Sequence, residues 1–361
     1  MRFDISLKGS KSKMSRAFKD VHYSAHLLNE IRLLKESGDA YPKVGYDSLS
    51  ATFLAKIAQE RGVDFATALF YNRIRNSNEH GPFINEIDSL IPIPTKLPQF
   101  SGRVLIVPAA FYREYPKYGG DGRLIREVAA GFGLEARLLS LPSTGTVTEN
   151  AALIRQALAA EPDKSVILVS LSKGGADVRI ALEAGGLPLR KVQVWLQICG
   201  LIRGSPLIDQ LLNGRWWQRV LLSGYLTYMG ANIRLAKELT HQSGSLLANP
   251  AFAPPEVLVI NVLGFPLTFH LVRNVRRRHQ KLAPFGPNDG STLLRDAIVE
   301  AGLTYPVWGA DHYFQVPEAS QLLHKLFLYL GRSGVLVSSN RKFVVANAVT
   351  ATRLPVDSAS S

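Results

Sequence analysis

Apolar residues in the middle of this chain come in short continuous runs, and stretches with helical spacing separate these runs. Six runs rich in apolar and β-branched residues predict strands over 103–107, 136–141, 166–170, 192–198, 257–263 and 303–308. The runs are mostly continuous rather than alternating, which is typical of strands that are buried on both faces. The pattern therefore predicts a largely parallel sheet that is covered by helices on both sides.

The stretches between these runs carry apolar and charged residues with the period of an α-helix. They predict helices over 122–131, 148–160, 176–184 and 291–301, and a final helix over 317–330. The final helix begins with a proline, which is best tolerated at a helix start. Strands that alternate with helices in this way are typical of βαβ units, so the predicted fold class is α/β.

Two further regions flank the predicted sheet. Residues 48–74 carry apolar positions at helical spacing that break near Gly62, which predicts an amphipathic helix pair. Prolines at 92, 94 and 98 indicate a linker into the first strand. We therefore expect a helical extension and linker over 1–99, a main domain over 100–330, and a tail over 331–361 that is partly disordered.

One predicted strand leads into a turn that is typical of a nucleophilic serine. Residues 165–169 continue directly into Ser170-Leu171-Ser172-Lys173-Gly174-Gly175. A strand, a very tight turn around one serine and a helix push the serine hydroxyl out of the backbone, and small neighbours are needed because the turn is strained. Ser172 is therefore the candidate nucleophile. An ordinary strand-to-helix turn would give the same six residues, so this motif alone leaves both interpretations open.

A carboxylate and a histidine follow Ser172, and Ser, then Asp, then His is the chain order that triads use in this kind of strand-turn-helix architecture. His312 comes just after the last predicted strand, and Asp289 lies before it in a loop of turn-forming residues. An Asn-Asp-Gly turn or a helix cap would equally explain Asp289. Asp296 is the fallback, although it falls on a predicted helix. Asp311 adjoins the histidine in sequence, which makes an approach of its side chain to the ring less natural.

The loop after the first predicted strand supplies a candidate oxyanion hole. In acyl transfer, one backbone N–H from this loop and one from the residue after the nucleophile bind the developing oxyanion. In this chain these would be the amides of Ala110 and Lys173, and the loop donor is uncertain by one residue within 109–111. Taken alone, a buried strand with a small-residue turn explains the segment as well.

Together with the turn Gly204-Ser205-Pro206-Leu207, these segments resemble an α/β-hydrolase of the lipase and esterase kind. The resemblance covers residues 102–330 and implies an eight-stranded, mostly parallel sheet, with hydrolysis through an acyl-enzyme. The chain departs from the family pattern at two places. Ser170 stands where the motif has its first glycine, and Pro108-Ala109 replaces the usual His-Gly of the oxyanion loop.

Residues 203–250 lie between two predicted strands and are expected to form a lid. Trp216 and Trp217 stand there among leucines, and with Phe111 they are the residues expected to line a pocket for an acyl or alkyl group. Packing of these aromatic side chains within the lid itself is the alternative.

The formal charge of +13 comes partly from clusters of Lys and Arg in the first 60 residues and in 273–281. Such clusters are most often solvated helix faces, and peripheral contact with an anionic membrane is the alternative. No zinc-ligand spacing, phosphate loop or nucleic-acid module accompanies them, so we expect no metal, no cofactor and no nucleic-acid partner. The single cysteine and the absence of an apolar core in residues 1–14 favour a cytoplasmic location.

These features predict a serine hydrolase that cleaves a small ester with an apolar acyl or alkyl group. His312, oriented by Asp289, would take the proton from Ser172, and water would release the acid from the acyl-enzyme. An acyltransferase or thioesterase would use the same residues. A catalytically silent binding protein on the same scaffold is the hypothesis from another class.

Overall fold

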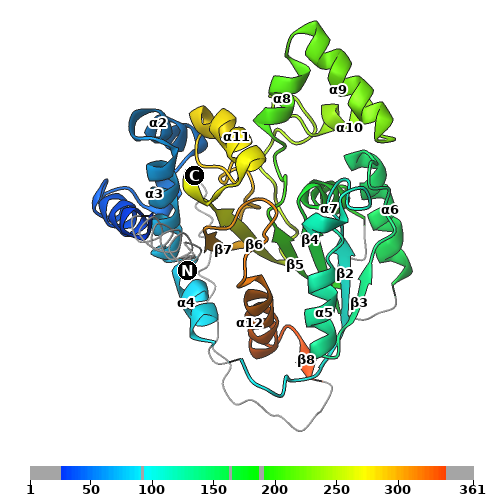
Figure 1. Ribbon diagram of the computed structural model, residues 1–361. Helices are drawn as coiled ribbons and strands as arrows, with labels where there is room; N and C mark the ends of the chain where they lie inside the picture. The colour runs from blue at the N-terminus through cyan, green and yellow to red at the C-terminus, as the bar shows by residue number, and fades with distance from the viewer. Residues whose placement is uncertain (1–25, 91–92, 162–164, 187–190, 339–361) are drawn as a thin grey trace, which may run out of the picture.

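Figure 1 shows the computed structural model of the protein, which describes residues 26–90, 93–161, 165–186 and 191–338. At its centre lies a six-stranded sheet in which every neighbouring pair is parallel. In spatial order the strands are β3 (Glu135–Leu138), β2 (Arg103–Val107), β4 (Val166–Leu171), β5 (Val192–Ile198), β6 (Leu258–Phe265) and β7 (Leu303–Trp308). The predicted α/β fold with a parallel sheet is confirmed, and each predicted strand is present.

The eight-stranded sheet that the resemblance implied is wrong for the described residues. The remaining two strands, β1 (Phe100–Ser101) and β8 (Val337–Ser338), form an antiparallel pair of their own. Each has only two residues, and they pair with each other rather than with an edge of the central sheet. The central sheet therefore has six strands.

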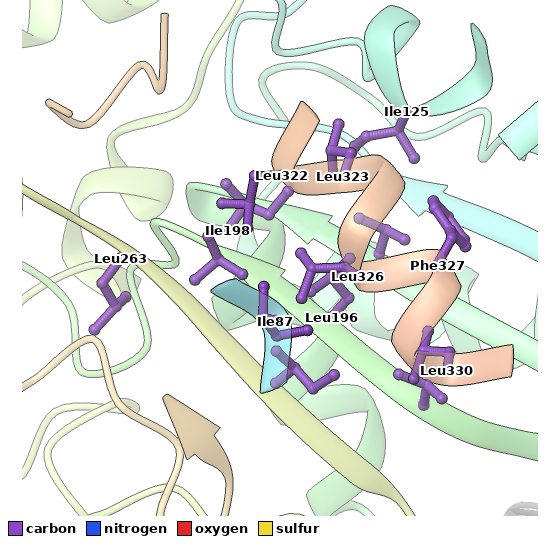
Figure 2. Close-up of a cluster of buried hydrophobic side chains, with 14 of the residues drawn as sticks. Ile87, Ile125, Leu196, Ile198, Leu263, Leu322, Leu323, Leu326, Phe327 and Leu330 are labelled. Carbon is purple, nitrogen blue, oxygen red and sulfur yellow. The ribbon is translucent and has the colours of Figure 1, made fainter. Parts of the chain in front are cut away.

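Helices cover both faces of this sheet, because successive strand residues point to opposite sides. On one face Val104 and Ile106 of β2 pack in the same core as Phe327, which belongs to α12 (Ala319–Arg332). Figure 2 shows α12 beside the strands, with Leu322 and Leu326 next to Ile198 and Leu196 of β5 and Leu323 next to Ile125. α5 (Arg123–Gly131) packs on the same face.

The other face of the sheet carries a second core. Here Leu105 and Val107 of β2 pack with Ile154 and Val178. These two side chains come from α6 (Val147–Ala160) and α7 (Lys173–Glu183), which match two of the predicted helices. Thr146 and Glu149 form a capping box at the start of α6, which satisfies the first free backbone amides of that helix.

The helix predicted over 291–301 is wrong, because these residues form a series of turns. The carboxylate of Asp289 accepts the backbone N–H groups of Ser291 and Thr292, both at 2.9 Å, which holds the chain in a turn. The apolar residues that suggested one helix face are buried on all sides instead: Leu293, Leu294, Ala297, Ile298 and Val299. Contacts from several directions therefore override the helical spacing.

The predicted helix pair in the N-terminal region is confirmed as α2 (Ala51–Arg61) and α3 (Val63–Arg75). Gly62 separates them with φ 90°, a conformation that favours glycine. The spacing did not predict a helix over residues 26–39 or α4 (Gly81–Ser89). Phe70 of α3 packs on Phe265 of β6, so this region joins the main core.

Residues 203–250 contain α8 (Pro206–Leu212), α9 (Trp216–Tyr228) and α10 (Ile233–Glu238), which lie together at one end of the molecule in Figure 1. α11 (Arg273–Leu282) is the basic helix. The expected tail lies outside the described residues from 339 onward. Within the described part of the chain, no helix has the length and apolar character needed to cross a membrane.

Candidate active site

Ser172 stands at the carboxyl end of β4 in a strained backbone conformation. Its φ is 51° and its ψ is −119°, a region that L-residues rarely adopt. Three backbone hydrogen bonds hold it there: its N–H donates to the Ile198 carbonyl at 3.1 Å, and its carbonyl accepts from Gly175 at 2.9 Å and Leu201 at 3.0 Å. These bonds to β4's neighbouring segments fix the turn that exposes the hydroxyl.

The two glycines after the serine are required by close packing. A Cβ on Gly174 would lie 2.7 Å from the carbonyl oxygens of both Val107 and Pro108, and one on Gly175 would lie 2.9 Å from the Cα of Gly200. Gly174 therefore allows the first turn of α7 to sit directly against the end of β2. This contact fixes the elbow relative to the loop that follows β2.

The Ser172 hydroxyl, the His312 ring and the Asp289 carboxylate form a continuous hydrogen-bonded chain. Ser172 Oγ lies 2.7 Å from His312 Nε2, and His312 Nδ1 lies 2.8 Å from Asp289 Oδ2. When the ring proton is on Nδ1, that nitrogen donates to Asp289 and Nε2 accepts from the serine. The His312 backbone N–H also donates to the Asp289 carbonyl at 3.1 Å, which ties the two loops together.

Asp289 is the carboxylate that meets the histidine, and the two alternatives are engaged elsewhere. The oxygens of Asp296 lie 2.9 Å from Arg203 Nη1 and 2.9 Å from His241 Nε2. Asp311 accepts the backbone N–H of Tyr313 at 2.9 Å.

Two backbone amides at the edge of the cavity have no hydrogen-bond acceptor among the described residues. On either side of Ala110, the Ala109 N–H donates to Gly120 and the Phe111 N–H donates to Ser143, each at 2.9 Å. The Ala110 N–H has no such acceptor, and neither has the N–H of Lys173 at the start of α7. Both residues line the cavity above Ser172. Of residues 109–111, Ala110 is thus the one whose amide is available.

The side chain of Lys173 forms an ion pair that sequence reasoning missed. Its Nζ lies 2.6 and 2.8 Å from the two oxygens of Asp177, and Asn150 donates to the same carboxylate at 2.9 Å. Burial raises the pKa of Asp177 to about 6, while the Lys173 ammonium acts to lower it. The signal in the sequence was the spacing of four residues between an Lys and an Asp on one helix.

A cavity of about 540 Å³ opens above Ser172 and His312. Phe111 lines it, and so do Leu207, Ile208 and Leu211 from α8. Five tyrosines also line the cavity: Tyr112, Tyr115, Tyr118, Tyr225 and Tyr313. The mixture of apolar side chains and a few polar groups is typical of a small-molecule site.

Trp216 and Trp217 are not brought into this cavity, which corrects the expectation that they line it. Their side chains are 71% and 43% exposed, on a face of α9 that also carries Val220, Leu221 and Tyr228. The contribution of α9 to the cavity is Tyr225, whose hydroxyl lies 3.0 Å from that of Tyr115.

Comparison with known proteins finds solved structures of similar fold but no match in sequence. No protein-family model and no curated protein sequence matches the chain. Among solved structures, the metagenomic carboxyl esterase MGS0156 is 19% identical with a TM-score of 0.55, over 68% of this chain and 80% of its own. The mature lipase BlEst2 of Bacillus licheniformis is 18% identical with a TM-score of 0.49, over 68% of this chain and 96% of its own.

Proposed function

Because the chain has the α/β-hydrolase fold, we propose that it is a serine hydrolase that cleaves carboxylic esters through an acyl-enzyme. The observation that carries this proposal is the hydrogen-bonded chain Ser172–His312–Asp289 at the carboxyl end of β4. A hydroxyl is a weak nucleophile by itself, and an adjacent base oriented by a carboxylate is what activates it.

In the proposed reaction, His312 takes the Ser172 proton on Nε2 while Oγ attacks the ester carbonyl. The imidazolium that forms is stabilised by the Asp289 carboxylate at Nδ1. The amides of Ala110 and Lys173 donate to the oxyanion of the tetrahedral intermediate. One such donor typically contributes about 10²- to 10³-fold to kcat.

His312 then returns the proton to the leaving alcohol, and the acyl group stays on Ser172. A water molecule, deprotonated by the same imidazole, attacks the acyl-enzyme and releases the acid. The apolar residues of α8 in the cavity wall support an ester with an apolar portion. The metagenomic carboxyl esterase MGS0156 has a similar fold, and its name gives the same class of substrate, which supports the proposal.

The proposal is tested by labelling the purified protein with a fluorescent fluorophosphonate, with 4-nitrophenyl esters of graded acyl length assayed in parallel. We expect labelling and turnover in the wild type and neither in Ser172→Ala or His312→Ala. Ser205→Ala is the matched control, because Ser205 lines the same cavity but its hydroxyl donates to the Ser291 carbonyl. A folded wild type that is not labelled would overturn the proposal and favour a silent binding protein.

Transfer of the acyl group to an alcohol or thiol, or hydrolysis of a thioester, would use the same residues. Product analysis with competing nucleophiles distinguishes these reactions. Free acid as the main product in the presence of glycerol or a thiol supports hydrolysis, and a dominant transfer product would replace it with an acyltransferase.

A further inference from the structure

The cavity above Ser172 is lined by a cationic side chain that forms no salt bridge with any described carboxylate. Its wall contains one arginine, Arg278 of α11, and one lysine, Lys173, but no aspartate or glutamate. The Lys173 ammonium is already paired with the buried Asp177 carboxylate. Among the described residues Arg278 makes no direct ion pair, and the Asp311 carboxylate, which does not line the cavity, interacts with it electrostatically without a salt-bridge contact.

Contacts with aromatic residues hold the Arg278 side chain in place. Its Nη2 donates to the Tyr313 hydroxyl at 3.1 Å, and its guanidinium carbon lies 5.5 Å from the centroid of that ring. The Tyr313 ring is stacked on Tyr118 with 4.3 Å between centroids. Arg278 Nε is buried and has no hydrogen-bond partner. Only one of the five guanidinium N–H groups has an acceptor among the described residues, so N–H donors remain on Nη1 and Nη2 while Tyr313 fixes the position of the side chain.

Other arginines on α11 do not share this arrangement. Arg276 donates to the Thr268 carbonyl at 3.0 Å, and Arg273 and Arg277 are exposed to solvent. The basic stretch of the sequence therefore has two parts: one side chain that lines the cavity, and several that belong to the surface. Only the first bears on what the cavity binds.

We propose that the substrate of this site carries an anionic oxygen group, a carboxylate or a phosphate, that binds Arg278 while the ester carbonyl lies at Ser172. The planar guanidinium fork matches the geometry of either group, and charge-assisted hydrogen bonds are among the strong ones in a partly dehydrated site. A neutral ester of the same shape would leave the Arg278 donors unpaired. This inference rests on the proposed hydrolysis and names the class of ester.

The first test compares pairs of esters in which one member is anionic and the other is neutral. One pair carries the anion on the acyl side: the mono-4-nitrophenyl ester of glutaric acid and its neutral methyl ester. The other carries it on the alcohol side: 1-octanoylglycerol 3-phosphate and 1-octanoylglycerol. The readout is the ratio of kcat/KM for the anionic member to that for the neutral member. We expect a ratio of at least 10 in one of the pairs, and that pair identifies where the anion lies.

Three variants of α11 then test whether Arg278 is the cause of the preference for the anionic ester. Arg278→Gln should lower the ratio at least 10-fold, and Arg278→Lys should restore part of it because the charge returns without the planar fork. Arg277→Gln removes the same charge from an exposed neighbouring position and should leave the ratio as in the wild type. A ratio near 1 in the wild type, or one that Arg278→Gln does not change, would overturn the inference while ester turnover itself stands.

A binding measurement keeps the inference testable if no ester is turned over. Calorimetric titration of the Ser172→Ala protein with hexyl phosphate, hexanoate and hexanol needs no catalysis. We expect at least one anion to bind 10-fold or more tightly than hexanol, and the difference to disappear in Ser172→Ala/Arg278→Gln. Equal binding of all three ligands would reject an anion site at Arg278.

Discussion

The indole N–H of Trp195 donates a 2.9 Å hydrogen bond to the hydroxyl of Ser170, deep between β4 and β5. Ser170 pairs with Gln197 in the sheet, so Trp195 is its diagonal neighbour on the adjacent strand. Both side chains are buried. Ser170, which stands where the esterase-like motif has a glycine, is thus the acceptor that satisfies a buried indole.

This bond predicts that placing a glycine at position 170 weakens the protein. Ser170→Gly and Ser170→Ala leave the Trp195 N–H buried without a partner, which should lower the free energy of unfolding by about 1–3 kcal/mol. Trp195→Phe removes the donor as well, so the double variant Ser170→Ala/Trp195→Phe should lose less than the sum of the two single variants. Denaturant unfolding measures this cycle. Strict additivity would mean that the hydrogen bond contributes nothing.

Asp289 and Asp296 provide a matched pair of buried carboxylates with different expected roles. In Asp289→Asn the amide NH₂ faces His312 Nδ1 and stabilises the wrong ring tautomer, so kcat should fall by about 10³- to 10⁴-fold while the fold is retained. Asp296→Asn weakens the contacts with Arg203 and His241 and should mainly lower stability, by about 1–3 kcal/mol. Ester kinetics and thermal unfolding of both variants separate the effects. Equal losses of kcat would contradict the assignment.

Gly174 should be intolerant of a single methyl group. Gly174→Ala places a Cβ against the Val107 and Pro108 carbonyls, which should cost about 1–3 kcal/mol of stability and displace the Lys173 amide. We expect activity to fall further than stability, because oxyanion donors act only in a narrow geometry.

Gly224 is the control for that variant. It lies in α9, is exposed, and has open space around its Cα. Gly224→Ala should therefore raise stability by about 0.5–1 kcal/mol through helix propensity. Unfolding curves and ester assays on both proteins test the contrast, and a fully active Gly174→Ala would show that the elbow packing is not needed for turnover.

The lowered pKa of His80 predicts that the folded protein loses stability as the pH falls. Burial lowers the pKa of His80 to about 4 from its ordinary value of 6.5, and neither ring nitrogen has a hydrogen-bond partner. Between these two pH values the unfolded chain binds more protons than the folded protein. The stabilising contribution is therefore complete above pH 6.5 and is lost as the pH falls toward 4, by about 1–3 kcal/mol.

Replacement of the His80 imidazole isolates its contribution to the pH dependence of stability. His80→Phe keeps an aromatic ring against Tyr46, which His80 meets edge-on with centroids 4.6 Å apart, and removes the titrating group. Urea unfolding at pH 7.5, 6.5 and 5.5 should show a shallower decline in this variant. Some decline remains, because burial also lowers the pKa of His279. An identical decline in both proteins would exclude His80 as a source.

Local constraints explain why the strands and the serine turn were predictable. Strands such as β2 and β5 are buried along their length, which leaves a continuous apolar run in the sequence, and the turn at Ser172 needs Gly174 and Gly175 for steric reasons. Each of these signals depends on neighbours within a few positions.

The features that escaped prediction depend on residues far apart in the chain. The turns over 291–301 are held by the Asp289 carboxylate and by burial from several sides, which helical spacing does not encode. The apolar pattern of α9 gave no indication of which residue meets the cavity: Trp216 is exposed away from it, while the half-exposed Tyr225 lines it. The position of Arg278 in the cavity follows from the way α11 packs.

The short β1–β8 pair places residue 100 opposite residue 338. Everything that builds the candidate site, from Ala110 to His312, lies between these two positions. The two ends of the segment 100–338 therefore lie next to each other. Neighbouring ends of this kind favour circular permutation and insertion of the segment into a loop of another protein. A short linker across β1 and β8 would close this segment into a ring without displacing any atom of the site.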